Sequence, residues 1–183
     1  LTRSLIAENS PYYLAGAKLN YSPTPALELS ALVCNGWQRI RPVRGNTLPG
    51  FGTQIKYTHR IAVLNWSTFI GTDDPNSSRR MRYFSNLYTQ LTLPRGWALT
   101  AGIDAGIQQA HKHSSSYRAW WGAALLVRYN FHRQWAAALR GEYYHDPARI
   151  IVSTTYTPGL HSAGLSGNID YQPLPAIALR VEA

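Results

Sequence analysis

The chain has 183 residues, enough for one folded domain, and it combines 45% hydrophobic residues with only 15% charged residues. Its net charge of +9 comes from Lys and Arg residues scattered from Arg3 to Arg180, whereas a nucleic-acid-binding protein gathers them on one face, so we expect no nucleic-acid partner. The single cysteine, Cys34, excludes an internal disulfide and a cysteine-based zinc site.

Ten segments of the chain alternate apolar residues with polar or small ones. In residues 97–108, WALTAGIDAGIQ, Trp97 and Ile103 lie on one face, and Thr100 and Asp104 lie on the other. This period of two predicts strands, and no segment has a convincing helical period. In chain order, the predicted strands cover residues 13–21, 27–34, 51–57, 62–70, 81–92, 97–108, 117–129, 135–143, 163–171 and 177–182.

The connections between these segments alternate between short and long. The short ones contain turn-forming residues and lie at 22–25, 92–96, 130–133 and 172–175, whereas the long ones lie at about 38–50, 72–80, 111–116 and 145–160. Such alternation is typical of outer-membrane barrels, in which a strand of about 9–11 residues crosses the bilayer. A run of about 18 apolar residues, which a membrane helix needs, is missing. We therefore predict an all-β, antiparallel up-and-down transmembrane barrel, with a soluble lipocalin-like barrel as the alternative.

Aromatic residues mark both ends of the predicted strands on their apolar faces. We expect them to form two girdles at the membrane interfaces, because Tyr and Trp favour positions with one dry and one wet side. The predicted girdle residues are Tyr21, Trp97, Tyr129, Trp135 and Tyr171 near the short turns, and Tyr13, Tyr117 and Tyr143 near the long loops.

Charged residues lie on the opposite faces of the strands. A charge facing lipid costs about 2–4 kcal/mol near the bilayer midplane, so these residues are expected to face the lumen. A ladder of these residues would satisfy the hydrogen-bonding groups of a narrow lumen, or it would form a constriction that selects ions by charge. The two roles are compatible. The candidates are Asp104, Arg118, Arg128, Arg140, Glu142, Asn168, Asp170, Arg180 and Glu182.

The charge balance of these faces predicts a weak preference for anions. Seven cationic residues on the polar faces stand against five acidic ones. The cationic set is Lys18, Lys56, Arg82, Arg118, Arg128, Arg140 and Arg180, and the acidic set is Glu28, Asp104, Glu142, Asp170 and Glu182.

Two features of the long loops raise other functions. Asp73-Asp74 and His145-Asp146 would lie at the extracellular rim, where carboxylate and His/Asp couples could activate water for hydrolysis, but Asp73-Asp74-Pro75-Asn76 is a turn sequence, which explains the Asp pair better. His111-Lys112-His113 has two imidazoles but no neighbouring cysteine or carboxylate. We expect no metal, no cofactor and no enzymatic activity.

Three stretches near the C-terminus carry a family resemblance. Residues 139–147 (LRGEYYHDP), 168–173 (NIDYQP) and 179–182 (LRVE) resemble the closing strands of the β-barrel porin-2 family of OmpL-like outer-membrane proteins, and Thr2-Arg3-Ser4 and Asn35-Gly36-Trp37 fit the same pattern more loosely. The resemblance implies a Gram-negative outer-membrane location and a porin-like role, and it brings no catalytic residues. Family members have further strands on both sides, so residues 1–183 are expected to be one barrel domain that is part of a larger barrel.

We therefore expect passive diffusion of small polar solutes or ions through an outer-membrane barrel, in contact with outer-membrane lipid. The alternative is a barrel plugged by its own side chains that serves as a structural or docking component of an envelope complex, with protein partners there. A hydrolase at the rim is a third, weaker hypothesis.

Overall fold

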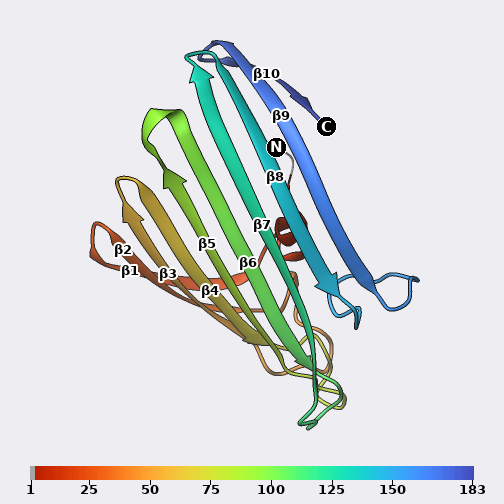
Figure 1. Cartoon of the computed structure of the whole chain (residues 1–183). Coiled ribbons are helices and arrows are strands. Elements are labelled where there is room, and N and C mark those ends of the chain that lie inside the picture. The colour runs from red at the N-terminus through yellow and green to blue at the C-terminus, as the bar shows by residue number, and fades with distance from the viewer. Residues whose placement is uncertain (1–2) are drawn as a thin grey trace.

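The computed structural model describes residues 3–183, which form one antiparallel sheet of ten strands (Figure 1). Thr2, which contributes to the family resemblance, lies outside the described residues. The strands are β1 (Gly16–Thr24), β2 (Leu27–Cys34), β3 (Gly50–His59), β4 (Ala62–Gly71), β5 (Arg82–Thr92), β6 (Trp97–Gln109), β7 (Tyr117–His132), β8 (Trp135–Asp146), β9 (Leu160–Leu174) and β10 (Ile177–Glu182).

Each strand pairs with its neighbours in the chain, in the order β1 to β10. The predicted all-β, antiparallel up-and-down fold with ten strands is therefore confirmed. Within residues 3–183, β1 and β10 are the two edges of the sheet, so the sheet is open. Short turns gather at one end of the strands and the connections 35–49, 72–81, 110–116 and 147–159 at the other (Figure 1).

The strand ends differ from the prediction at several turns. The first strand begins at Gly16 and not at Tyr13, and the ninth begins at Leu160 and not at residue 163. The predicted turn at 22–25 is too long, because β1 continues through Pro23 to Thr24. Pro23 has no N–H to donate, and the pairing with β2 shifts register between Tyr21 and Thr24, so the proline is accommodated at an irregularity and does not end the strand.

The two faces of the sheet differ in burial. We call the face on which the short helix α1 (Leu5–Asn9) lies the inner face, and the opposite one the outer face. Strand β8 shows the contrast: Ala136 and Tyr144 on the inner face are buried, whereas Trp135 and Leu139 on the outer face are 40% and 55% exposed. The outer face exposes large apolar side chains along the whole sheet, among them Leu19, Ile55, Trp66, Leu87, Ile103, Leu125, Leu165, Ile169 and Leu179.

Helix α1 was not predicted, since the first residues of the chain read as a loop. Ser4 caps it: the Ser4 side chain accepts a hydrogen bond from the Ala7 backbone N–H at 3.3 Å, and the Ser4 carbonyl accepts one from Glu8 at 2.9 Å. A second short element, η1 (Pro94–Gly96), forms the turn before β6. Within residues 3–183, no helix has the length and apolar character needed to cross a membrane.

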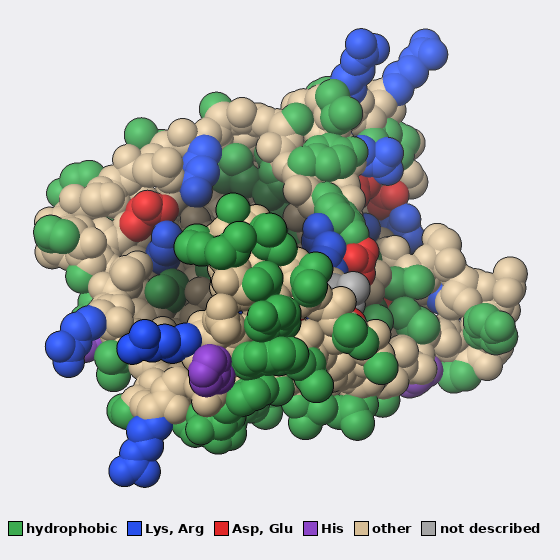
Figure 2. Space-filling view, turned by 90° about the horizontal axis from the view of Figure 1, so that it is seen from above, with side chains coloured by type: hydrophobic (Ala, Val, Ile, Leu, Met, Phe, Trp, Pro, Cys, Tyr) green, Lys and Arg blue, Asp and Glu red, His purple; other side chains and the backbone are tan. Residues whose placement is uncertain are grey.

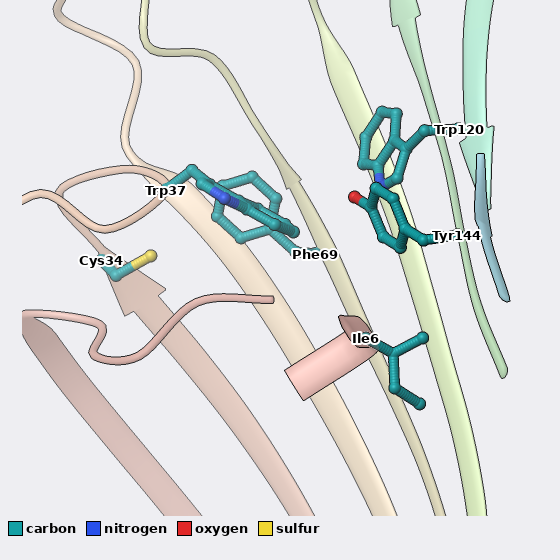
Figure 3. Close-up of a cluster of buried hydrophobic side chains, with 6 residues drawn as sticks. All are labelled: Ile6, Cys34, Trp37, Phe69, Trp120 and Tyr144. Carbon is teal, nitrogen blue, oxygen red and sulfur yellow. The ribbon is translucent and has the colours of Figure 1, made fainter. Parts of the chain in front are cut away.

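An apolar cluster lies on the inner face toward the long-loop end (Figure 3). Trp37, from the connection after β2, packs edge-on against Phe69 and Phe84 with ring centroids 5.3 and 4.9 Å away. Trp120 stacks on Phe84 at 6.4 Å. Large aromatic side chains therefore fill part of a face whose sequence pattern predicted polar or small residues.

Candidate functional site

A shared carboxylate organises the inner face near the short turns. Asp170 of β9 lies directly opposite Arg180 of β10 and accepts hydrogen bonds from its Nε at 2.6 Å and its Nη2 at 3.2 Å. Arg128 of β7 reaches the same carboxylate with Nη1 at 2.5 Å, and Asn168 Nδ2 donates to it at 2.6 Å. Two guanidinium groups therefore share one carboxylate, and the cluster has a net positive charge.

The exposure of this cluster is uneven. The Arg128 and Arg180 side chains are 36% and 46% exposed, whereas that of Asp170 is 11% exposed. Both arginines and Asp170 line a cavity of about 630 Å³, together with His132 at the end of β7 and Arg133 and Gln134 from the turn that follows. Figure 2 looks onto this end of the molecule, where Lys and Arg side chains are more prominent than Asp and Glu. The cavity wall therefore carries three arginines and one carboxylate, and the two arginines paired with Asp170 are more exposed than it is.

A second ion pair lies deeper on the inner face. Arg140 Nε and Glu142 Oε1 of β8 are 3.2 Å apart, and both side chains are less than a tenth exposed. Glu142 also accepts a hydrogen bond from the Leu5 backbone N–H of α1 at 2.6 Å. The helix therefore rests against this ion pair, which secures its first turn.

Three further lumen candidates remain: Glu182, Asp104 and Arg118. Glu182 lies opposite Asn168 in the pairing of β10 with β9. Asp104 of β6 is 3% exposed and accepts a hydrogen bond from Asn86 at 2.5 Å. Arg118 lies opposite Gln108 near the long-loop end and is exposed. Ion pairs thus join Arg128 and Arg180 to Asp170, and Arg140 to Glu142, and Asp104 lines the same cavity as Arg140.

Ile6 of α1 is an inner-face residue that the sequence did not reveal. A Cβ at Gly102 or Gly122 would lie 3.0 or 2.7 Å from the Ile6 side chain, so the helix occupies a hollow that the two glycines leave. Ser4 before two apolar residues was a weak signal for a helix start. Helix α1 has only five residues, so no periodic pattern could have predicted that it packs on strands far from it in sequence.

Trp37 is a second inner-face residue whose packing the sequence did not reveal, although Asn35-Gly36-Trp37 contributed to the family resemblance. Its backbone N–H donates to Asp73 Oδ1 at 2.9 Å, and Asp73 Oδ2 pairs with Arg82 at 3.1 Å. The Arg82 guanidinium lies 5.3 Å from the Trp37 ring centroid. These contacts fold the connection between β2 and β3 back over the inner face.

The rim carboxylates hold the long loops. Arg80 donates to both Asp74 oxygens, at 2.7 and 2.9 Å, and this hydrogen bonding lowers the pKa of Asp74. Asp146 is fully buried and accepts backbone N–H groups from residues 150–152 at 2.8–3.0 Å. His145 precedes Asp146 in a strand, so the two side chains point to opposite faces and the couple required by the hydrolase hypothesis is not assembled.

Aromatic pairs lie on the outer face near both ends of the strands. Near the short turns, Trp97 stacks on Tyr129 and Trp135 stacks on Tyr171, each with ring centroids 4.4 Å apart. Near the long loops, Tyr143 packs against Trp121 at 5.1 Å, and Tyr83 packs against Tyr117 at 6.2 Å. Tyr21 is an exposed outer residue of β1. Tyr13 precedes β1, and its hydroxyl donates to the Gln38 carbonyl at 2.9 Å.

Comparison with protein families agrees with this architecture. The family model described as "Putative beta-barrel porin-2, OmpL-like" matches residues 1–183, the whole chain. The chain belongs to this family. As an OmpL-like porin it is a protein of the bacterial outer membrane, and its open ten-stranded sheet is porin-like. No curated protein and no solved structure matches it.

Family membership indicates that the outer face contacts membrane lipid. A porin-like barrel of this family contacts membrane lipid and solutes. Outer-membrane barrels present an apolar band and aromatic residues to lipid, which is the character of the outer face here. The family description is that of porins.

Proposed function

We propose that the inner face forms part of the wall of a pore through which small polar solutes or ions diffuse passively, with a weak preference for anions. The observation that carries this proposal is the cluster at the cavity, where Arg128 and Arg180 are exposed and Asp170, their shared partner, is covered. A permeating anion meets two guanidinium groups, whereas a cation finds the carboxylate already occupied.

The orientation and closure of the barrel follow from the same proposal. The long loops face the outside of the cell and the short turns the periplasm, as in other outer-membrane barrels. The aromatic pairs at the two ends of the outer face act as the interfacial girdles. Because unpaired backbone groups cannot be left in lipid, strands beyond the ten described here pair with the edges at β1 and β10. The intact mass and terminal sequences of the mature protein test this closure.

Reversal potentials across a planar bilayer with a KCl gradient test the anion preference. We expect the protein to favour Cl⁻ weakly, and the double variant Arg128→Gln/Arg180→Gln to shift toward K⁺, because Asp170 then loses both cationic partners. Arg60→Gln is the matched control, since Arg60 lies exposed in the short turn between β3 and β4 and outside the cavity. An equal shift in the control, or a K⁺ preference in the unaltered protein, refutes the role of the cluster.

A second function has its own support. Helix α1 and the aromatic cluster around Trp37 both lie on the inner face, where they reduce the space available to solutes. A barrel filled in this way would serve as a structural or docking component of the cell envelope. Current recordings on inserted protein separate this function from a conducting pore.

A further inference from the structure

Two histidines face each other on the outer face, at the long-loop end of the sheet. His145 of β8 and His161 of β9 are direct partners in the antiparallel register. Their Nδ1 atoms are 2.9 Å apart, and their rings meet edge to face with centroids separated by 4.4 Å. Because the strand pairing places both side chains on one face, the imidazoles are neighbours independently of any loop.

The surroundings leave this pair accessible. His161 is exposed and His145 is half-buried. The closest rings are those of Trp121 and Tyr143, at 6.1 and 6.4 Å from His145. Neither neighbour carries a charge that would repel a cation. By contrast, the other close histidines, His111 and His113, flank the cationic Lys112 in an exposed loop.

The distance between the two nitrogens suits a shared metal ion. With metal–nitrogen bonds of about 2.0–2.1 Å, two nitrogens on one ion lie about 2.9 Å apart at a right angle and about 3.4 Å apart in a tetrahedron. Right angles between ligands belong to square-planar and octahedral ions. Imidazole nitrogen suits Cu²⁺ and Ni²⁺, which favour tetragonal geometry, and Cu²⁺ binds most tightly among the divalent ions of its row.

We propose that His145 and His161 form a binding site for a divalent transition-metal ion, Cu²⁺ or Ni²⁺, on the outer rim of the barrel. In the metal-free protein one Nδ1 donates a hydrogen bond to the other. The metal replaces this hydrogen bond: the ring that carried its proton on Nδ1 takes the tautomer with the proton on Nε2, and both Nδ1 lone pairs bind the ion. No group of three or more His, Cys, Asp or Glu residues suited to a metal occurs within residues 3–183, so water completes the coordination.

The test is titration of the untagged full chain in detergent micelles with Cu²⁺ alone, followed by calorimetry and electron paramagnetic resonance. We expect one bound Cu²⁺ whose spectrum shows coupling to two equivalent nitrogens. His145→Gln and His161→Gln should each weaken binding by at least about tenfold, since even the loss of residues that only orient metal ligands costs about 10–100-fold. Both positions lie on the surface of the sheet, and circular dichroism confirms that the variants keep their strands.

The matched control is the double variant His111→Gln/His113→Gln, which removes the other neighbouring imidazoles and should leave Cu²⁺ binding unchanged. Three results overturn the proposal: no Cu²⁺ binding by the unaltered chain, binding that survives both single variants, or binding that is lost in the control. None of these results bears on whether the barrel conducts, so the site and the pore are tested separately.

Discussion

Replacement of Gly106 by alanine probes the packing of the inner face most sharply. A Cβ at Gly106 would lie 2.1 Å from Cζ2 and 2.3 Å from Cη2 of Trp120, which is its direct partner on β7. Carbon atoms in contact are normally about 3.5–4.0 Å apart, so the indole must move by more than an ångström. Trp120 is only 1% exposed and packs against Phe84 and Trp37, so both of these rings must move with it.

The cost follows from two opposing effects. Overpacking of a well-filled core costs about 1–3 kcal/mol, and a clash with two atoms of a confined ring belongs in the upper half of that range. Alanine in place of glycine in a strand returns about 0.5–1 kcal/mol of backbone entropy. We therefore expect Gly106→Ala to lower the free energy of unfolding by about 1–2.5 kcal/mol.

Gly141→Ala is the matched control, because a Cβ at Gly141 meets no atom within 4 Å. This variant should be as stable as the unaltered protein or slightly more stable. The assay is urea unfolding in detergent micelles, followed by tryptophan fluorescence and circular dichroism. If the two variants unfold within about 0.5 kcal/mol of each other, close to the usual effect of a surface substitution, then Trp120 does not occupy the space over Gly106 and the reasoning fails.

Two further predictions concern lipid contact and the rim. A lysine at Ile103, on the outer face, should lower the fraction of protein that inserts into vesicles, because a charge facing lipid costs about 2–4 kcal/mol near the midplane. A lysine at Thr100, on the inner face, should leave insertion intact and alter conductance. Equal insertion of the two variants would contradict the assignment of faces. Arg80 lowers the pKa of Asp74, so this pair stabilises the fold fully above the unfolded pKa of about 4, and the stabilisation is lost as the pH falls through the lowered pKa of the folded protein. Asp74→Ala should therefore cost about 0.2–1 kcal/mol in urea unfolding at pH 7 and less at pH 3, and a constant difference across this range would count against the pair.

The strands of this protein were readable because each crosses the sheet with one apolar and one polar face. Residues 97–108 were predicted as a strand, and β6 spans Trp97–Gln109. The turn residues also placed most connections, although Pro23 was taken for a turn and lies within β1. Alternation of apolar and polar residues shows which residues share a face of a strand, and it predicts strands well where every strand is amphipathic.

The contents of the inner face were less predictable. Trp120 and Phe69 are large apolar residues among polar neighbours, and what they pack against depends on Trp37, which comes from a loop distant in sequence. Helix α1 has five residues, too few to show a helical period, and its position depends on a hydrogen bond to Glu142, 137 residues away. Alternation likewise placed Arg128 and Arg180 on one face, but only the register of the strands shows that they share Asp170.

Single-channel recording in planar bilayers tests the porin role most directly. The intact protein, inserted into the bilayer and shown to be folded by circular dichroism, should produce discrete steps of current in KCl. An open pore predicts these steps even with α1 and Trp37 on the inner face. Correctly inserted protein that carries no current would contradict passive diffusion and leave the filled, structural barrel as the function of the fold.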